Sequence, residues 1–486
     1  MNDASYPGSG FGLNDVAIQA NPFPAYEWLR ENAPVYRADD MPMWVVVSRH
    51  EDIEAILRDP VTFSSDLGIS VPLMSMVMRD APDHSRLRQT VNRAFTPRNI
   101  RHLEARITEI ARSLLAAAPR QVEFVQAYAN LLSVTVICEM LGVPLDRREE
   151  MNRFARDALV ASFAAVGMGS AELFAEVQTG LASLMEILDQ AIEQHLRAPQ
   201  DNIISALVAE EANGVLSRDE LRNLCALLLI GGHETTSNLI ASGAYILAET
   251  PALWRELKTA PEKIPKFVEE LVRLRAPLQR IARRTTREAT IAGTTLPADT
   301  LLRLFPGSAN LDPRRWPDPR KLDLARDARS HLGFGTGIHA CPGAPLARLE
   351  GRIAFQVLLQ ESESIALDPA HRAVPIAGYA AGGLGWRILP LIRTPAAGGR
   401  AMPSPDDVFE PVCGIVADSL GLDRGDIDAA TCAKNTPEWD SLAHLMILDA
   451  IEKAFRVKLP RLAAYRVKDV GELVQLVAAE TGRPGG

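Results

Sequence analysis

Residues 331–355 read HLGFGTGIHACPGAPLARLEGRIAF. Three closely spaced glycines before the cysteine predict a loop with unusual backbone angles or a close approach to a flat group, because glycine has no Cβ. Cys341 follows this loop, and Pro342 and Gly343 introduce a regular helix. A cysteine just before a helix has backbone N–H donors and the helix dipole beside it, and both favour the thiolate over the thiol. Such a thiolate is able to ligate iron.

The same segment resembles the haem-binding loop of the cytochrome P-450 family. The residues that match the family pattern are Phe334, Gly335, Gly337, His339, Cys341 and Gly343. The resemblance implies a mainly α fold with small β-sheets. It also implies that the loop binds haem b, with Cys341 as the axial ligand of the iron.

Residues 227–240, LLLIGGHETTSNLI, belong to a long apolar helix and yet contain two glycines and a carboxylate. We predict that this helix begins after a capping box of Ser217 and Glu220 and runs to about Glu249, where Pro251 stops it. Each interior glycine costs about 1 kcal/mol relative to alanine, and a carboxylate that faces apolar packing needs a partner. Some function must therefore compensate for these residues.

In the family that the cysteine loop resembles, this helix crosses the distal face of the haem. The resemblance implies that Gly231 and Gly232 leave room for dioxygen and relax the backbone hydrogen bonding. Glu234 and Thr235 resemble the acid and alcohol pair that delivers protons to the bound oxygen, and such a pair must lie within hydrogen-bond reach of it. We expect Thr236 to be only a neighbour on the helix.

Further motifs of the family follow along the chain. Glu270 and Arg273 match the family's Glu-x-x-Arg motif, which is a buried ion pair there, whereas the four residues alone would suggest an exposed i,i+3 pair. The third partner of this pair is either Lys321 or Arg326. The residues that resemble contacts to the haem propionates are His84, Arg88, Arg283 and His331.

Two apolar stretches, residues 66–78 and 158–170, line the substrate pocket by analogy with the family, and both contain Met and small side chains. They predict a largely hydrophobic substrate, although such runs are also typical of ordinary core. Because the chain shows no flavin or iron–sulfur motif, we expect electrons from an external ferredoxin or flavodoxin. Four arginines near the expected proximal face could bind that partner, or could simply be solvated: Arg86, Arg93, Arg348 and Arg352.

Short strands are expected between the helices. Residues 44–47 (WVVV) are one candidate, and residues 290–293 (TIAG), before a turn at Pro297, are another.

Near residue 394 the sequence TPAAGGRAMPSPDD is small, proline-bearing and unpatterned, which indicates a linker. We expect a haem-thiolate monooxygenase domain over residues 1–394, a linker over 395–404 and a second domain over 405–486. Apolar periodicity predicts three main helices around a separate core in this second domain. The core candidates are Val408, Val412, Ile415, Val416, Leu442, Leu445, Met446, Leu448, Ile451, Phe455, Val470, Leu473, Val474 and Val477.

Asp440 and Ser441 stand at the start of an amphipathic helix in PEWDSLAHLMILDAIEKAF, where the ordinary interpretation is a helix cap. The segment also resembles the Asp-Ser-Leu site of acyl and peptidyl carrier proteins, whose serine carries 4′-phosphopantetheine. Its phosphodiester would lie at a helix N-terminus, which favours an anion. The resemblance implies a P-450 fold followed by a small helical-bundle carrier domain. A phosphopantetheinyl transferase and a carrier-loading enzyme or synthase are the implied partners.

The 486 residues, 47% hydrophobic and 23% charged, have the composition of an ordinary globular protein. A net charge of -9 argues against nucleic acid as the main partner. We find no signal peptide and no apolar stretch of about 18 residues, so we expect no membrane partner and a cytoplasmic protein. Five widely spaced cysteines without a CxxC pair suggest neither a disulfide framework nor a zinc site.

Together, these patterns predict a haem-thiolate monooxygenase that hydroxylates or otherwise oxidises an apolar substrate, namely an acyl or aminoacyl chain tethered as a thioester to a carrier protein. The alternative is a monooxygenase that acts on a free small molecule, with the C-terminal domain an unmodified docking module for a synthase. A haem-binding sensor without turnover is disfavoured by the pair of Glu234 and Thr235.

Overall fold

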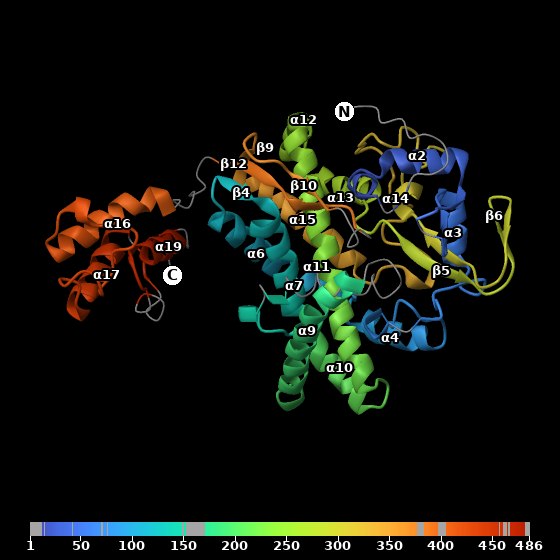
Figure 1. Cartoon of the computed structure of the whole chain (residues 1–486), viewed down its shortest axis with the longest axis horizontal. Helices are drawn as coiled ribbons and strands as arrows, with labels where there is room; N and C mark the ends of the chain where they lie inside the picture. The colour runs from blue at the N-terminus through green and yellow to red at the C-terminus, as the bar shows by residue number, and fades with distance from the viewer. Residues whose placement is uncertain are drawn as a thin grey trace. The chain divides into compact units, whose positions relative to one another are not determined.

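The computed structural model of the chain (Figure 1) describes residues 12–13, 15–40, 42–69, 71–74, 76–147, 150–151, 171–376, 383–396, 405–455, 457–459, 464 and 467–481. The chain forms two compact units. The first consists of Met1–Ala111, Glu123–Leu359 and Leu367–Pro390, and the second of Arg112–Val122, Gln360–Ala366 and Leu391–Gly486.

Helices make up most of the first unit, as predicted. They are α1 (Val16–Ala20), α2 (Phe23–Asn32), α3 (His50–Arg58), α4 (Asp83–Ala94), α5 (Pro97–His102), α6 (Glu104–Ala117), α7 (Leu131–Leu141), α9 (Ala171–Arg197), α10 (Ile203–Ala212), α11 (Arg218–Glu249), α12 (Pro251–Thr259), α13 (Ile264–Leu274), α14 (Pro306–Ala309) and α15 (Ala344–Glu361). Short 3-10 turns include η1 (Pro72–Met74) and η6 (Gly337–His339), and a π-helical segment, η2 (Val125–Asn130), leads into α7. The last residues of α6 and α15 belong to the second unit.

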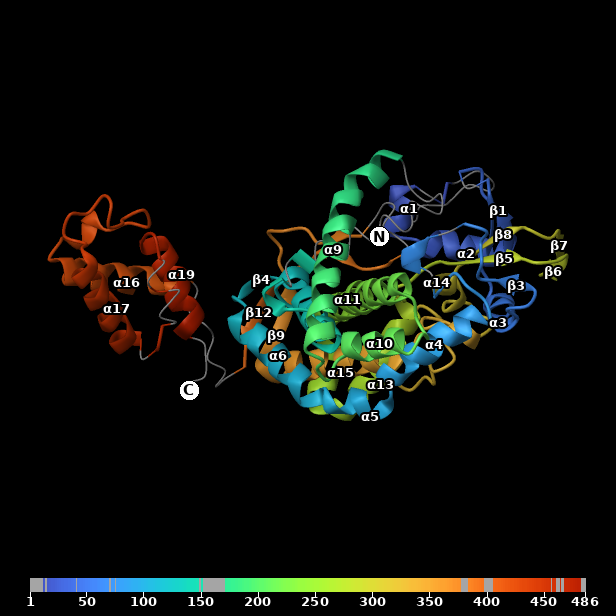
Figure 2. The same cartoon turned by 90° about the horizontal axis from the view of Figure 1, so that it is seen from below.

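The central helix α11 has the bounds that its sequence predicts. The Ser217 side chain accepts from the Glu220 N–H while the Glu220 side chain accepts from the Ser217 N–H, which completes the capping box. Two views place α11 inside the unit, with α9 and α10 beside it (Figures 1 and 2), and it packs against α7 and η2 as well. Within the described part of the chain, every helix is too short or too polar to cross a lipid bilayer.

A five-stranded sheet in the first unit has the order β1 (Val35–Arg37), β2 (Trp44–Val47), β8 (Leu301–Leu304), β5 (Ile281–Thr285) and β3 (Phe63–Ser64). The pair β2 and β8 is parallel and the other pairs are antiparallel. Because successive side chains of a strand point to opposite faces, Val45 and Leu302 pack in one core cluster and Trp44 and Val46 in another. The strand predicted at residues 44–47 is confirmed.

The second predicted strand is only partly correct. β6 (Ala289–Ile291) ends before Ala292, and β7 (Thr294–Leu296) returns antiparallel to it. Ala292 and Gly293 have φ values of 47° and 79°, the left-handed conformation that a two-residue hairpin turn requires. The chain therefore reverses before Pro297, because Gly293 supplies the turn. A further two-stranded sheet joins β10 (Val374–Pro375) and β11 (Trp386–Ile388).

The second unit contains a three-stranded sheet of order β4 (Gln121–Glu123), β12 (Pro390–Pro395) and β9 (Ser362–Leu367). It also contains the three helices predicted near the C-terminus, which are α16 (Pro405–Leu420), α17 (Ser441–Phe455) and α19 (Val470–Thr481). A short 3-10 turn, η7 (Arg424–Asp426), follows α16.

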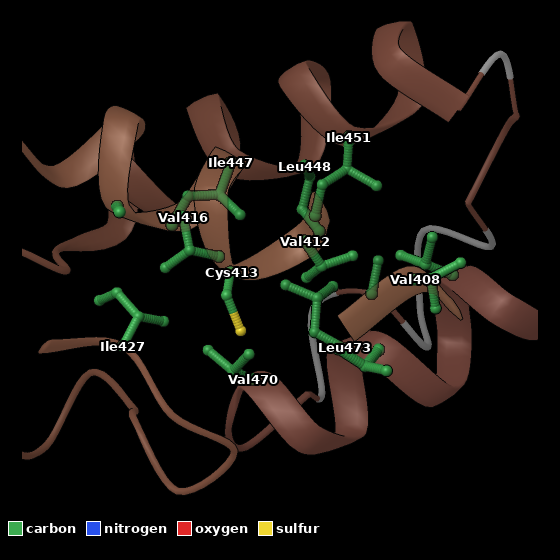
Figure 3. Close-up of a cluster of buried hydrophobic side chains, with 14 of the residues drawn as sticks. Val408, Val412, Cys413, Val416, Ile427, Ile447, Leu448, Ile451, Val470 and Leu473 are labelled. Carbon is green, nitrogen blue, oxygen red and sulfur yellow. The ribbon is translucent and has the colours of Figure 1, made fainter. Parts of the chain in front are cut away.

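The three C-terminal helices surround their own apolar core (Figure 3). Side chains of α16, α17 and α19 point toward one another there, among them Val412, Ile447 and Leu473. Two of the predicted core residues are wrong, since Leu445 is 44% and Met446 53% exposed. The buried side of α17 instead carries Ile447, Leu448 and Ile451, because positions four apart share one face of a helix and Leu445 and Met446 lie on another.

Candidate functional site

The cysteine loop runs from Gly333 through η6 to the start of α15. Gly335 and Gly337 have φ values of 66° and 71°, in the left-handed region that glycine tolerates. A Cβ at Gly337 would lie 2.3 Å from the carbonyl oxygen of Leu57. The Cys341 N–H donates to the Phe334 carbonyl over 2.9 Å. The loop therefore closes on itself and holds the cysteine just before the N-terminus of α15, as predicted.

The Cys341 side chain is exposed and lines a cavity of about 300 Å³, which we call the cysteine-side cavity. Burial in the surrounding protein raises the pKa of its thiol. The backbone N–H groups of Gly343 and Ala344, and the charges of Arg88 and Arg348, oppose that shift. The expected bias of the helix N-terminus toward thiolate is therefore present, but desolvation outweighs it.

Four basic side chains gather beside this cysteine, and we call them the basic cluster. The rings of His84 and His339 lie 4.0 Å apart, Arg88 donates to the Ala340 carbonyl, and Arg283 is 5% exposed. Burial lowers the pKa of Arg283 to about 10. Burial, together with the charges of Arg283, His84 and Arg88, lowers the pKa of His339 to about 3. Because these groups disfavour one another as cations, an anion among them would be stabilised.

The basic cluster fits the propionates of a haem. His84 is 2% exposed and, among the described residues, its Nε2 has no hydrogen-bond partner, which is costly unless a ligand supplies one. Asp80 acts as a single negative charge on both His84 and Arg283. Two propionates would supply the remaining charge, and Cys341 lines the same cavity as His84. The cluster would hold the propionates while Cys341 ligates the iron.

His331, another predicted propionate contact, is placed elsewhere. Its Nε2 lies 3.2 Å from Oε2 of Glu269 on α13, and the Gly333 N–H donates to its Nδ1 over 3.1 Å. Both ring nitrogens are engaged in holding the loop to α13. The structure therefore brings His339, rather than His331, against His84.

On α11, Gly231, Glu234 and Thr235 lie at the cavities, and Thr235 donates its hydroxyl proton to the Gly231 carbonyl over 2.7 Å. A Cβ at Gly231 would meet no atom within 4 Å, whereas a Cβ at Gly232 would lie 2.9 Å from Cδ1 of Ile137 on α7. The two glycines therefore serve different purposes. Gly231 leaves cavity space, as expected, but Gly232 also allows the close approach of α7.

A second cavity of about 300 Å³ adjoins the cysteine-side cavity, and Gly231 and Thr235 line both. Its lining is mainly apolar and includes Leu67, Met74, Val77, Met78, Leu227 and Ile230. The predicted stretch 66–78 thus supplies part of the lining. The other predicted stretch, 158–170, lies outside the described residues. A more open hollow of about 730 Å³, lined by Arg58 and Trp316, shares no residue with either cavity.

Glu270 and Arg273 on α13 are both fully buried and form two hydrogen bonds, of 2.7 Å from Nε and 2.9 Å from Nη2. They are therefore a buried pair, as the resemblance implies. Arg326 Nε lies 3.3 Å from Oε1 of Glu270, as an ion pair without hydrogen-bond geometry. Lys321 contributes only its carbonyl, which accepts from Arg273 over 3.2 Å. Arg326 is thus the third charged partner.

Each of the four arginines considered for electron-partner docking is paired with a carboxylate. The pairs are Arg86–Glu220, Arg93–Glu210, Arg348–Glu269 and Arg352–Glu104. The first two tie α4 to α11 and α10, and the last two tie α15 to α13 and α6. The four do not form one free basic surface, and an acidic partner would have to compete with these carboxylates.

Two cavity residues were not anticipated from the sequence. Arg280 and Arg303 line the second cavity and are 6% and 2% exposed. The sequence does contain a pattern that marks Arg303, because this arginine interrupts the apolar run LLRLF at residues 301–305. A charge in a strand whose neighbours are apolar is expensive unless it has a purpose.

The comparisons with known proteins agree with this site. A model of the cytochrome P450 family matches residues 8–367. The chain is 37% identical over 364 residues to vitamin D(3) 25-hydroxylase of Pseudonocardia autotrophica, which covers 71% of this chain and 88% of that protein. A mutant of P450 EryK in complex with erythromycin B has a TM-score of 0.70 at 33% identity, over 77% of this chain and 97% of that one.

P450BioI in complex with an acyl carrier protein ligated to hexadec-9Z-enoic acid has a TM-score of 0.72 at 29% identity, over 78% of this chain and 99% of that one. These similarities extend over about three quarters of the chain and include the cysteine loop, α11 and the sheet. The chain belongs to the cytochrome P450 family, in its bacterial type, and is a P450 monooxygenase.

Proposed function

We propose that this monooxygenase hydroxylates, or otherwise oxidises, a predominantly apolar small molecule bound in the second cavity. The observation that carries the proposal is that Gly231 and Thr235 line both the cysteine-side cavity and the mainly apolar second cavity. Haem b held by Cys341 would supply the iron that activates dioxygen. A substrate in the second cavity would then lie against the same two residues of α11.

The residues of α11 would handle protons. The Thr235 hydroxyl is held by the Gly231 carbonyl at 2.7 Å, so it stays at the boundary of the two cavities. Glu234 lines the second cavity and is the acid next to that hydroxyl in the chain. Proton transfer needs donors within hydrogen-bond reach of the reacting oxygen, and this pair is placed along one wall of the site.

A relative named for hydroxylation of vitamin D(3) and a solved relative with bound erythromycin B support a free small molecule as the substrate. Bacterial members of the family generally take electrons from ferredoxin-type proteins, and we propose a ferredoxin or flavodoxin for this chain. With its four candidate arginines already paired, we expect the docking surface to include other residues.

The haem-loaded protein tests this proposal. Reduced and treated with carbon monoxide, the wild type should show the Soret band of thiolate coordination. With a ferredoxin and its reductase it should then form an oxygen-dependent product from an apolar substrate. Cys341→Ala should lose both properties, while Cys432→Ala, which changes a half-exposed cysteine outside the cavities, should keep both. Retention of the thiolate band in Cys341→Ala would refute the assignment.

A second candidate function keeps the same chemistry and presents the substrate on a carrier. The start of α17 favours it, because the helix begins at Ser441 and the Asp440 carboxylate accepts the Ala443 N–H over 2.8 Å. A phosphodiester on a serine at a helix N-terminus would be stabilised there. A solved relative binds an acyl carrier protein with its acyl chain attached.

In this second candidate, residues 405–486 are an acyl or peptidyl carrier domain that the linker 395–404 joins to the oxygenase, residues 1–394. Ser441 would carry 4′-phosphopantetheine. Incubation with coenzyme A and a phosphopantetheinyl transferase should raise the intact mass of the wild type by one phosphopantetheine, but leave Ser441→Ala unchanged. If the wild type also stays unmodified, the C-terminal helices are a docking module for a synthase, and the free small molecule remains the substrate.

A further inference from the structure

Two buried arginines lie against the second cavity on one face of the five-stranded sheet. In the antiparallel pairing of β5 with β8, Ala282 is opposite Arg303 and Arg283 is opposite Leu302. Opposed residues share a face and successive residues alternate. Arg303 therefore points to the other side of the sheet from Arg283, which belongs to the basic cluster at the cysteine.

Aromatic rings identify the face on which the two arginines lie. The Arg303 guanidinium lies 3.8 Å from the ring centre of Trp44, and that of Arg280 lies 5.3 Å from the ring centre of Phe305. Trp44 and Phe305 belong to the same core cluster as Leu67, which also lines the second cavity. Arg280 and Arg303 are thus neighbours within one apolar wall of that cavity.

Neither guanidinium forms an ion pair in the part of the chain that the structure describes, although the charge of Asp40 acts on Arg280. No carboxylate among the described residues lies within 4 Å of either group, and Nε and Nη2 of Arg303 are buried without a hydrogen-bond partner. Arg280 donates from Nη2 to the Leu13 carbonyl over 3.0 Å, while its Nε has no partner. Burial and, to a smaller extent, the charge of Arg280 lower the pKa of Arg303 to about 9.

A buried charge without a counter-ion is destabilising, and an aromatic ring offsets only part of that cost. In the wall of a cavity this destabilisation can be offset, because a bound ligand can bring the missing negative charge. Guanidinium groups bind oxyanions through parallel N–H bonds, and those bonds are strong in a desolvated site.

Building on the proposed oxidation of an apolar substrate in this cavity, we propose that Arg303, assisted by Arg280, binds an oxyanion carried by the substrate. The substrate is then an apolar chain or ring system with an anionic end, not a neutral hydrocarbon. The oxyanion has two possible sources: the carboxylate of a free acid, or the phosphodiester of a phosphopantetheine arm.

The second cavity is also lined by Arg283 and His339 of the basic cluster, so the oxyanion site adjoins the one that would hold the haem propionates. The charges that act on His339 are those of Arg283, His84 and Arg88, whereas the charge that acts on Arg303 is that of Arg280. Although both arginines line this cavity, the register of β5 with β8 turns Arg303 to the face of the sheet opposite Arg283. Loss of Arg303 should therefore leave haem binding intact.

Calorimetric titration of the haem-loaded full chain tests the proposal with three probes. They are dodecanoate, its neutral methyl ester, and S-dodecanoyl-4′-phosphopantetheine. Arg303→Gln should weaken binding of at least one anionic probe by about 10- to 100-fold, the worth of a charged hydrogen-bond pair. Binding of methyl dodecanoate should stay within about twofold of the wild type, which shows that the cavity is intact. Arg37→Gln, at an exposed position of the same sheet, is the control and should change nothing.

The probe that loses affinity identifies the source of the oxyanion, since loss for dodecanoate points to a free acid and loss for the thioester points to the arm. Should Arg303→Gln fold poorly, Arg280→Gln and Arg303→Lys repeat the test, each with a smaller loss that is again confined to the anionic probes. The proposal is overturned if the wild type binds neither anion more tightly than the ester, if ester and anions weaken equally, or if the variants lose haem. A different result would contradict the proposed oxidation itself, namely that the wild type forms no oxygen-dependent product from any of the three probes.

Discussion

Replacing Glu270 with Gln should destabilise the first unit more than most single substitutions. Glu270 accepts two hydrogen bonds from Arg273, of 2.7 and 2.9 Å, and one from the Asp323 N–H over 3.0 Å. Both side chains of the pair are fully buried, and Arg326 adds a second positive charge 3.3 Å away. Gln keeps the shape of Glu but removes the only negative charge of the group.

The loss of unfolding free energy can be estimated from the hydrogen bonds that Arg273 keeps in the variant. In Glu270→Gln, Arg273 keeps its bonds to the carbonyls of Asn310, Pro319 and Lys321, but it becomes a buried cation without a counter-ion. Breaking a buried pair in this way costs about 3–5 kcal/mol. Because the three carbonyl bonds remain, we expect a loss near about 3 kcal/mol. This loss is equivalent to a fall in Tm of roughly 5 °C or more.

The neighbouring Glu269 offers a matched control. It lies on the same helix, is 18% exposed, and pairs with Arg348, which is 40% exposed. Because this pair is only partly buried, it should contribute less than the fully buried pair, and Glu269→Gln should cost about 1–2 kcal/mol, the bond to His331 included. Thermal unfolding followed by the Soret absorbance of bound haem reports on the first unit alone. The expectation is wrong if Glu270→Gln has the same Tm as the wild type, or if Glu270→Gln and Glu269→Gln lower the Tm equally.

Three further outcomes are expected. Gly243→Ala should lower Tm, by an overpacking cost of about 1–3 kcal/mol that exceeds the gain in helix propensity, because its Cβ would lie 2.2 Å from Cζ of Phe355; an unchanged melting curve contradicts this. Thr235→Ala should consume dioxygen but form at least about tenfold less product than the wild type. Thr235→Ser keeps the hydroxyl, so it should form as much product per dioxygen consumed as the wild type does. Burial raises the pKa of Glu269, but hydrogen bonds from His331 and Arg348 outweigh it and bring the pKa to about 2. Since the usual value is 4.5, this stabilisation should be complete above pH 4.5 and disappear as pH falls toward 2, so that the Tm difference between wild type and Glu269→Gln narrows in acid.

The parts of the site that could be predicted from the sequence are those that depend on residues close together in the chain. The loop before Cys341 needs its glycines, since Gly337 has no room for a Cβ, and the capping box at Ser217 is a local device. The partners of single charged residues could not be predicted in this way. Arg86 meets Glu220 across 134 positions of the chain, and His331 turns to Glu269 because α13 passes beside the loop. Such pairings depend on packing between distant elements, which no local pattern encodes.

A buried position can face either protein or cavity, and this difference separates residues that look alike in the sequence. Gly231 and Gly232 are adjacent, yet a methyl group added to the first would enter the cavity and one added to the second would strike Ile137. Arg283 and Arg303 are both buried arginines of neighbouring strands, yet the register of β5 with β8 sends them to opposite faces of the sheet. Both line the second cavity, but only Arg283 belongs to the basic cluster, whereas Nε and Nη2 of Arg303 have no hydrogen-bond partner among the described residues. Register, which follows from strand pairing and not from residue type, therefore decides which arginine would meet the cofactor and which would meet the substrate.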